Sequence, residues 1–123
     1  MDQEKYQEMQ MLDYQIKQMQ KLIENIDAQL FEIGSTVDAL QEFERLENND
    51  EVLFPVANGI FAKGRLTDNK MLKVNVGSNV VTEKTVKDTV EMMQKQAEDI
   101  GNYKREVVGQ LQKFISKIQE LEK

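Results

Sequence analysis

Two heptad repeats of nearly equal length restrict the folds that this sequence can adopt. The first repeat places apolar residues at alternating spacings of three and four: Met9, Leu12, Ile16, Met19, Ile23, Ile26, Leu30, Ile33, Val37 and Leu40. This spacing, kept over more than four heptads, is typical of a coiled-coil helix. Only Gly34 and Ser35 weaken this repeat, because such a pair favours bending of a helix.

The second repeat follows the same rule in the last third of the chain. Its members are Val86, Val90, Met93, Ala97, Ile100, Lys104, Val107, Leu111, Phe114, Ile118 and Leu121. Lys104 is the one polar member, and its aliphatic stem can lie along an apolar seam while the ammonium group stays in water. Thr85 precedes the repeat as an expected N-cap, with Asp88 three residues further on.

Between the repeats lies a segment with the composition of short strands. We expect strands over 52–56, 60–66, 71–76 and 80–84, separated by turns at 57–59, 67–70 and 77–79. The turns contain Gly and Asn, which tolerate positive φ. Pro55 predicts an edge strand or a strand end, because proline cannot donate to a ladder. Two β-hairpins are therefore expected.

The predicted fold class is α+β, in one domain over 1–123. A coiled-coil helix over 1–50 leads into two β-hairpins over 51–84, and a second coiled-coil helix over 85–123 returns. Helices joined by a compact strand block should pair antiparallel within one chain, which brings the two chain ends together. A parallel homodimer of each helix is the alternative, but it would require the strand block to span opposite directions.

Composition argues against several classes of function. The sequence has no cysteine and no histidine, so it lacks thiolate metal sites, the commonest metal ligand and the commonest general base, and no enzyme is expected. Gly59–Leu66 spaces two glycines like a phosphate-binding loop, but Arg65-Leu66 stands where Lys-Ser/Thr is required. No cofactor or metal is expected.

The charge pattern and the apolar pattern bear on partners and location. Residues 1–51 carry a net charge of −9, which argues against binding nucleic acid. No apolar run approaches the roughly 20 residues of a membrane span, and the absence of cysteine suits a reducing cytosol. A cytoplasmic protein is expected.

Several apolar side chains near the chain ends lie off the predicted seams, among them Tyr6, Met11, Tyr14 and Ile115. A two-helix coil buries only its seam, so these residues should stay partly exposed unless another chain covers them. They are interpreted either as a surface that grips a partner or as the margin of a broad seam.

The whole chain, with its two coiled-coil segments and two β-hairpins, resembles the α-type subunit of prefoldin, a chaperone family. The most similar stretches are Leu53–Val56 through Gly59 to Lys63-Gly64, and Val74–Gly77 through Val81–Lys84. Two hairpins favour the α type, since the β type has one. Ala57-Asn58 and Asn79 replace glycines that are commoner in the family, at turn positions that Asn can occupy.

The resemblance implies an assembly of two α-type and four β-type subunits, whose hairpins join into β-barrels. It implies that the coiled-coil tips hold unfolded client proteins without ATP and pass them to a group II chaperonin. The substrate-binding residues expected on this basis are Tyr6, Met9, Met11, Leu12, Tyr14, Phe114, Ile115, Ile118 and Leu121. The oligomer-interface residues expected are Val52, Phe54, Val56, Ile60, Phe61, Leu66, Leu72, Val74, Val76, Val80 and Val81.

A second interpretation is a structural protein whose coil sets distances and binds no clients. Some α-type relatives form filaments, so a spacer or filament-forming subunit is the alternative function.

Overall fold

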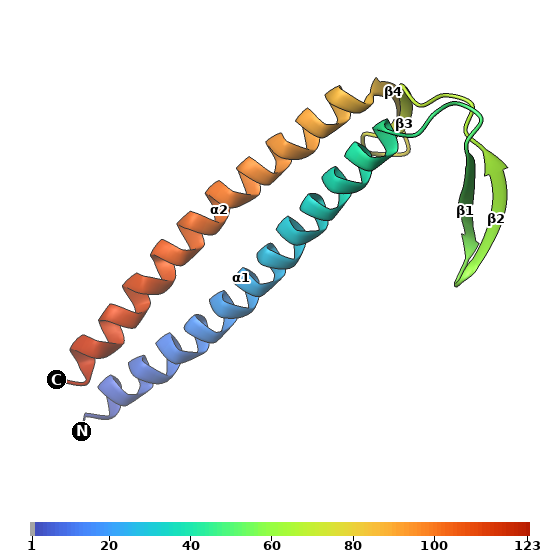
Figure 1. Ribbon diagram of the computed structural model, residues 1–123. Helices are drawn as coiled ribbons and strands as arrows, with labels where there is room; N and C mark the ends of the chain where they lie inside the picture. Colours follow the sequence, from blue (N-terminus) through green and yellow to red (C-terminus); the bar gives the residue numbers. More distant parts are fainter. Residues whose placement is uncertain (1) are drawn as a thin grey trace. The chain divides into compact units, whose positions relative to one another are not determined.

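The computed structural model describes residues 2–123, and Met1 lies outside the described residues. Helix α1 spans Gln3–Glu44 and helix α2 spans Val86–Leu121, with four strands between them (Figure 1). The chain divides into two compact units. One contains the residues up to Ile33 together with Lys95–Lys123, and the other contains Gly34–Gln94. The predicted α+β class, with two long helices and two β-hairpins, is confirmed.

The heptad positions form the buried seams of both helices. Every one of them is buried or half-buried, and the deepest are Leu12, Ile16, Ile26, Val86 and Val107. Lys104 is accommodated as expected, since its side chain keeps 35% of its surface exposed and reaches an acid on the other helix. The positions between the heptad members are mostly exposed, as expected for helices that bury one stripe each.

Polar contacts between α1 and α2 in the first unit fix their relative direction. Lys5 Nζ donates to the carbonyl oxygen of Lys123 at 3.5 Å. Further along, Lys117 Nζ lies 3.3 Å from Glu8 Oε1, and Lys104 Nζ lies 2.6 Å from an oxygen of Asp27. Residue numbers rise along α1 as they fall along α2, so the helices are antiparallel and the described chain ends meet (Figure 1). The intramolecular pairing is therefore the one observed.

The junctions between helices and strands follow local chemistry. Thr85 caps α2, because its Oγ1 accepts from the backbone N–H of Asp88 at 3.0 Å. Helix α1 ends at Glu44, before the boundary expected at residue 50. The backbone N–H of Glu47 instead donates to Asp50 Oδ2 at 2.8 Å. Side chains that offer the backbone such alternative partners end a helix early.

Strands β1 (Glu51–Ala57) and β2 (Ile60–Arg65) form the first antiparallel hairpin. The register pairs Val52 with Gly64 and Phe54 with Ala62, and it shifts between Pro55 and Ala57. Proline cannot donate a hydrogen bond to a neighbouring strand, so it is tolerated here beside the register shift of a two-stranded sheet.

Strands β3 (Met71–Asn75) and β4 (Val81–Thr85) form the second antiparallel hairpin. Its turn contains three consecutive residues with positive φ: Gly77, Ser78 and Asn79. Glycine and asparagine adopt this conformation readily, so the predicted turn is confirmed. Serine adopts it less easily, and the sequence did not indicate that Ser78 would do so.

Neither a membrane span nor a metal site appears among residues 2–123. None of their helices is long and apolar enough to cross a bilayer. In the same residues, Asp and Glu side chains form no group that could hold a metal ion.

The seam predicts a strong contrast between two large apolar residues of α1. Ile26→Ala should lower the free energy of unfolding by about 2–4 kcal/mol, because Ile26 is only 3% exposed and its loss leaves a cavity. Phe31→Ala should change it by less than about 0.5 kcal/mol, because Phe31 is 78% exposed. Urea unfolding followed by circular dichroism measures both, and equal losses would contradict this assignment of the core.

Candidate functional site

Two regions of the chain carry the residues expected to function, and neither resembles a catalytic centre. The terminal region consists of residues 2–14 and residues 114–123, and the strand region consists of residues 51–85. No ionisable group in the described chain combines burial with a convergent set of partners. The two regions instead present apolar side chains to solvent.

The terminal region contains an apolar hollow between α1 and α2 of about 360 Å³. We call this the terminal hollow, and its lining residues are Tyr6, Met9, Gln10, Asp13, Ile118 and Glu122. Gln10 Nε2 donates to the hydroxyl oxygen of Tyr6 at 3.0 Å, which holds the ring at the edge of the hollow. The coil thus forms a cavity where α1 begins and α2 ends.

The structure brings the nine predicted substrate-binding residues into this one region, at different depths. Tyr6, Met11 and Tyr14 are exposed by 53–65%, and Ile115 by 37%. Leu12 is buried in the seam. The remaining four are half-buried, namely Met9, Phe114, Ile118 and Leu121. A partner could reach the first group directly, whereas Leu12 becomes available only if the terminal turns of the helices separate.

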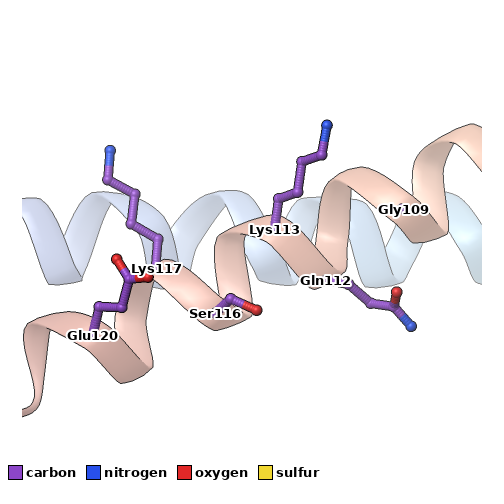
Figure 2. A pocket seen from close by; sticks show the side chains of 6 residues that line it. All are labelled: Gly109, Gln112, Lys113, Ser116, Lys117 and Glu120. Carbon is purple, nitrogen blue, oxygen red and sulfur yellow. The ribbon is translucent and has the colours of Figure 1, made fainter.

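A second, larger hollow on α2 is polar and open. Its volume is about 600 Å³, and Figure 2 shows its six lining residues, Gly109, Gln112, Lys113, Ser116, Lys117 and Glu120. The two lysine side chains extend away from Gln112 and Ser116, so the polar groups do not converge on one point (Figure 2). Ser116 has no histidine to activate it, since the sequence contains none. This hollow offers no arrangement for catalysis.

In the strand region, the β1–β2 hairpin is apolar on both faces. One face presents Phe54, which is 49% exposed, and Val52, which is half-buried. The opposite face presents Leu53 and Phe61, exposed by 61% and 58%. A two-stranded sheet with this much exposed apolar surface is marginal by itself and needs partners.

The contact between Phe54 and Gly64 orders one face of this hairpin. A Cβ atom added to Gly64 would lie 2.1 Å from Cε2 of Phe54, so the ring covers the glycine closely. An aromatic side chain laid over a cross-strand glycine protects the strand where glycine leaves no side chain to pack.

The β3–β4 hairpin differs, because one face is half-buried and the other exposed. Leu72, Val74 and Thr82 lie on the half-buried face. The exposed side chains include Val81, at 59%, and the turn residues Val76 and Val80, at 47% and 54%. The predicted interface residues therefore divide into an exposed set and a half-buried set, Val52, Leu66, Leu72 and Val74.

A polar clamp at the base of the first hairpin is a feature that sequence reasoning missed. Asn69 Nδ2 donates to the carbonyl oxygen of Leu46 at 2.7 Å. The Asn69 backbone N–H donates to Asn48 Oδ1 at 3.1 Å. Beside it, the Asn49 N–H donates to the Leu66 carbonyl oxygen at 2.7 Å. These bonds join the connection before β1 to the connection after β2. The Asn and Asp residues at 48–50 and 68–69 indicated turns, but nothing local showed that the turns would meet.

Four exposed apolar residues were also absent from the predicted site. Leu53 and Met71 lie in the strand region, exposed by 61% and 39%, while Phe31 lies on α1 and Tyr103 on α2. Leu53 could have been found from strand alternation, which places it on the face opposite Phe54. Phe31 lies off the heptad seam, so its exposure could have been read from the repeat.

A pair of long helices packed along heptad seams, with two β-hairpins between them in sequence, defines a coiled-coil protein of the prefoldin type. Comparisons with known proteins agree. The sequence matches the family described as prefoldin subunit over residues 12–123. The chain belongs to the prefoldin family, and its curated relatives identify it as an α-type subunit.

Two relatives and one solved structure illustrate the similarity. The prefoldin subunit alpha of Thermoplasma acidophilum is 31% identical over 96 residues, covering 72% of this chain and 73% of the relative. That of Thermofilum pendens is 26% identical over 106 residues, covering 86% and 82%. A cryo-EM structure of filamentous PFD from Methanocaldococcus jannaschii matches with a TM-score of 0.85, covering 94% of this chain and 95% of that chain. At 16% identity, the last match shows the shared fold alone.

Family membership makes this chain a subunit of a chaperone that assembles with other prefoldin subunits. The exposed strand region agrees with assembly, because open strand edges and apolar faces are ordinarily paired or covered in a stable protein.

The Phe54–Gly64 contact gives a test of the first hairpin. Gly64→Ala should expel the Phe54 ring and weaken the hairpin by about 1 kcal/mol, because the new methyl group would overlap the ring. The measurement is the amide hydrogen exchange of β1 and β2, which reports local opening.

A double-mutant cycle supplies the control. In a Phe54→Ala background the same Gly64→Ala change should cost much less, because the overlapping ring is gone. An equal loss of protection in both backgrounds would contradict the proposed contact.

Proposed function

We propose that this chain is a subunit of an ATP-independent holdase, which binds unfolded polypeptide at the terminal region and delivers it to a group II chaperonin. The observation that carries the proposal is the exposed apolar surface of the terminal region, centred on Tyr6, Met11 and Tyr14. An unfolded chain exposes apolar side chains, and covering them prevents aggregation by mass action. This chemistry needs no bound nucleotide and no catalytic group, so the chain acts as a binding protein and not as an enzyme.

The physical character of the terminal region suits varied clients. Methionine is flexible and polarizable, so it adapts to side chains of different shape, and tyrosine contributes apolar area with a polar edge. Tyr6, Met9, Met11 and Tyr14 lie within about three turns at the start of α1. The contacts are individually weak, which allows release to a chaperonin.

The strand region serves assembly in this proposal. The hairpins join those of β-type subunits, in an assembly of two α-type and four β-type subunits, to form β-barrels. The apolar faces of β1–β2 and the exposed valines of β3–β4 support this role, because closure into a barrel pairs every strand edge. The chain works in the cytoplasm, where nascent proteins require such holding.

Serine substitutions at Met11, Tyr14 and Ile115 test the gripping surface. The triple variant should require about tenfold more protein for equal suppression of client aggregation, equivalent to about 1.4 kcal/mol of binding free energy. The measurement is light scattering of a denatured client diluted into buffer containing the assembled protein.

A matched control uses Phe31→Ser with Tyr103→Ser, which removes two exposed aromatic rings outside the terminal region. This control should keep full suppression, and both variants should assemble normally. Undiminished suppression by the triple variant would remove these residues from the binding surface.

A filament-forming spacer is the second candidate function, and the similarity to the fold of a filamentous prefoldin supports considering it. The two functions separate in one comparison, in which aggregation of a client is followed with this chain alone and with a β-type partner. Suppression in either condition supports the holdase. Absence of suppression in both, together with self-assembly of the chain alone by native mass measurement, supports the spacer.

A further inference from the structure

We propose that the terminal hollow selects client segments in which an apolar side chain is followed or preceded by a lysine or an arginine. This inference rests on the proposed holding function and adds to it a preference in sequence. The residues that carry it are Tyr6, Met9 and Ile118 for the apolar side chain, and Asp13 and Glu122 for the cation.

The apolar part of the hollow is preformed. Ile118 and Met9 are half-buried, and the Tyr6 ring is held at the edge by the hydrogen bond from Gln10. A volume of about 360 Å³ accommodates one large side chain with part of its neighbour. Preformed pockets bind with a smaller loss of conformational entropy than surfaces that must first be ordered.

The charged part of the hollow lacks a matching cation of its own. Among residues 2–123, no cation lies within ion-pair distance of Glu122. Asp13 has only Lys17, one helical turn away at 3.1 Å in an exposed pair, which is a weak interaction that a client can replace.

The remaining lysines near the hollow do not supply the missing cation for Glu122 or Asp13. Lys117 lies against Glu8 at 3.3 Å, and Lys5 donates to the carbonyl oxygen of Lys123 at 3.5 Å. Residues 2–13 contain four acidic side chains and one lysine, while residues 114–123 contain two of each sign. The terminal region therefore has a net side-chain charge of −3, which attracts basic segments and repels acidic ones.

The end of α2 adds a second, independent reason. A helix C-terminus carries a partial negative charge, so a nearby cation stabilises the helix and a nearby carboxylate destabilises it. The last turn of α2 has no basic residue, and Glu122 follows it directly. Lys5 Nζ reaches the Lys123 carbonyl oxygen, which lies two residues beyond the helix end at Leu121. A client lysine beside Ile118 would meet both the carboxylate and the helix end.

Three matched peptides test the preference. They share one unstructured sequence, in which each leucine is followed by lysine, by glutamine or by glutamate. Binding to the full chain, alone and assembled with a β-type partner, is measured by fluorescence anisotropy. We expect the Leu-Lys peptide to bind most tightly and the Leu-Glu peptide most weakly, with a difference that shrinks as salt is raised.

Glu122→Gln isolates the charge from the shape of the hollow. It should weaken binding of the Leu-Lys peptide by about two- to fivefold and leave the Leu-Gln peptide unchanged, as expected for a partly solvated ion pair. Glu106→Gln is the control, because it makes the same charge change at an exposed position of α2 outside the hollow. Tyr6→Ser should weaken binding of all three peptides.

The outcomes distinguish this inference from the function on which it rests. Equal binding of the three peptides, with client aggregation still suppressed, overturns the preference and leaves the holdase standing. A loss on Glu122→Gln no greater than on Glu106→Gln overturns the role of Glu122. Failure to bind any peptide and failure to suppress aggregation together overturn the proposed function itself.

Discussion

The burial of two apolar stripes against each other is the interaction on which this structure depends. Neither helix has another way to remove its heptad residues from water, and helices of this length gain most of their stability from packing. Side chains such as Ile26 and Val107 are nearly inaccessible although the protein has no layered core. Because the seam uses one stripe of each helix, off-seam apolar side chains such as Tyr6, Met11 and Phe31 remain exposed and available to partners. The surface proposed to hold clients is therefore left exposed by the same one-stripe helix packing that folds the chain.

The strand region faces the opposite situation. Its hairpins have no seam to complete them, and their exposed residues include aromatic side chains such as Phe54 and Phe61. Besides its backbone ladder, two contacts help to order the first hairpin: the ring of Phe54 over Gly64, and the clamp formed by Asn48 and Asn69. These contacts fix the conformation that is presented to other subunits, which lowers the entropy cost of assembly.

The sequence predicted the fold well because its signals are periodic and local. Heptad spacing determined which residues would be buried, and turn residues such as Gly59 and Asn79 marked the hairpins. The end of α1 at Glu44 was less accessible, because turn residues alone do not show that Asp50 will accept from the Glu47 N–H. The clamp was less accessible as well, because its hydrogen bonds join segments more than 15 residues apart, such as Asn69 to Leu46. For the terminal region, the sequence indicated which residues gather there. It could not indicate the hollow, whose shape depends on which residue of α2 lies opposite Met9.

Lys104, the polar residue in the seam, helps to define how α1 and α2 are aligned along their axes. An entirely apolar heptad seam can slide by seven residues, about 10 Å along the axis, with little change in packing. Lys104 disfavours such a shift, because its ammonium group lies 2.6 Å from Asp27 in the observed register. In a shifted register the lysine would lose this partner, which costs at most about 1 kcal/mol because both side chains are partly exposed. The same register brings Ile118 into one hollow with Tyr6 and Met9. One ion pair in the seam thus supports the geometry of a hollow whose Ile118 lies 14 residues further along α2 than Lys104. The arrangement of the terminal region is therefore tied to the pairing of the two helices.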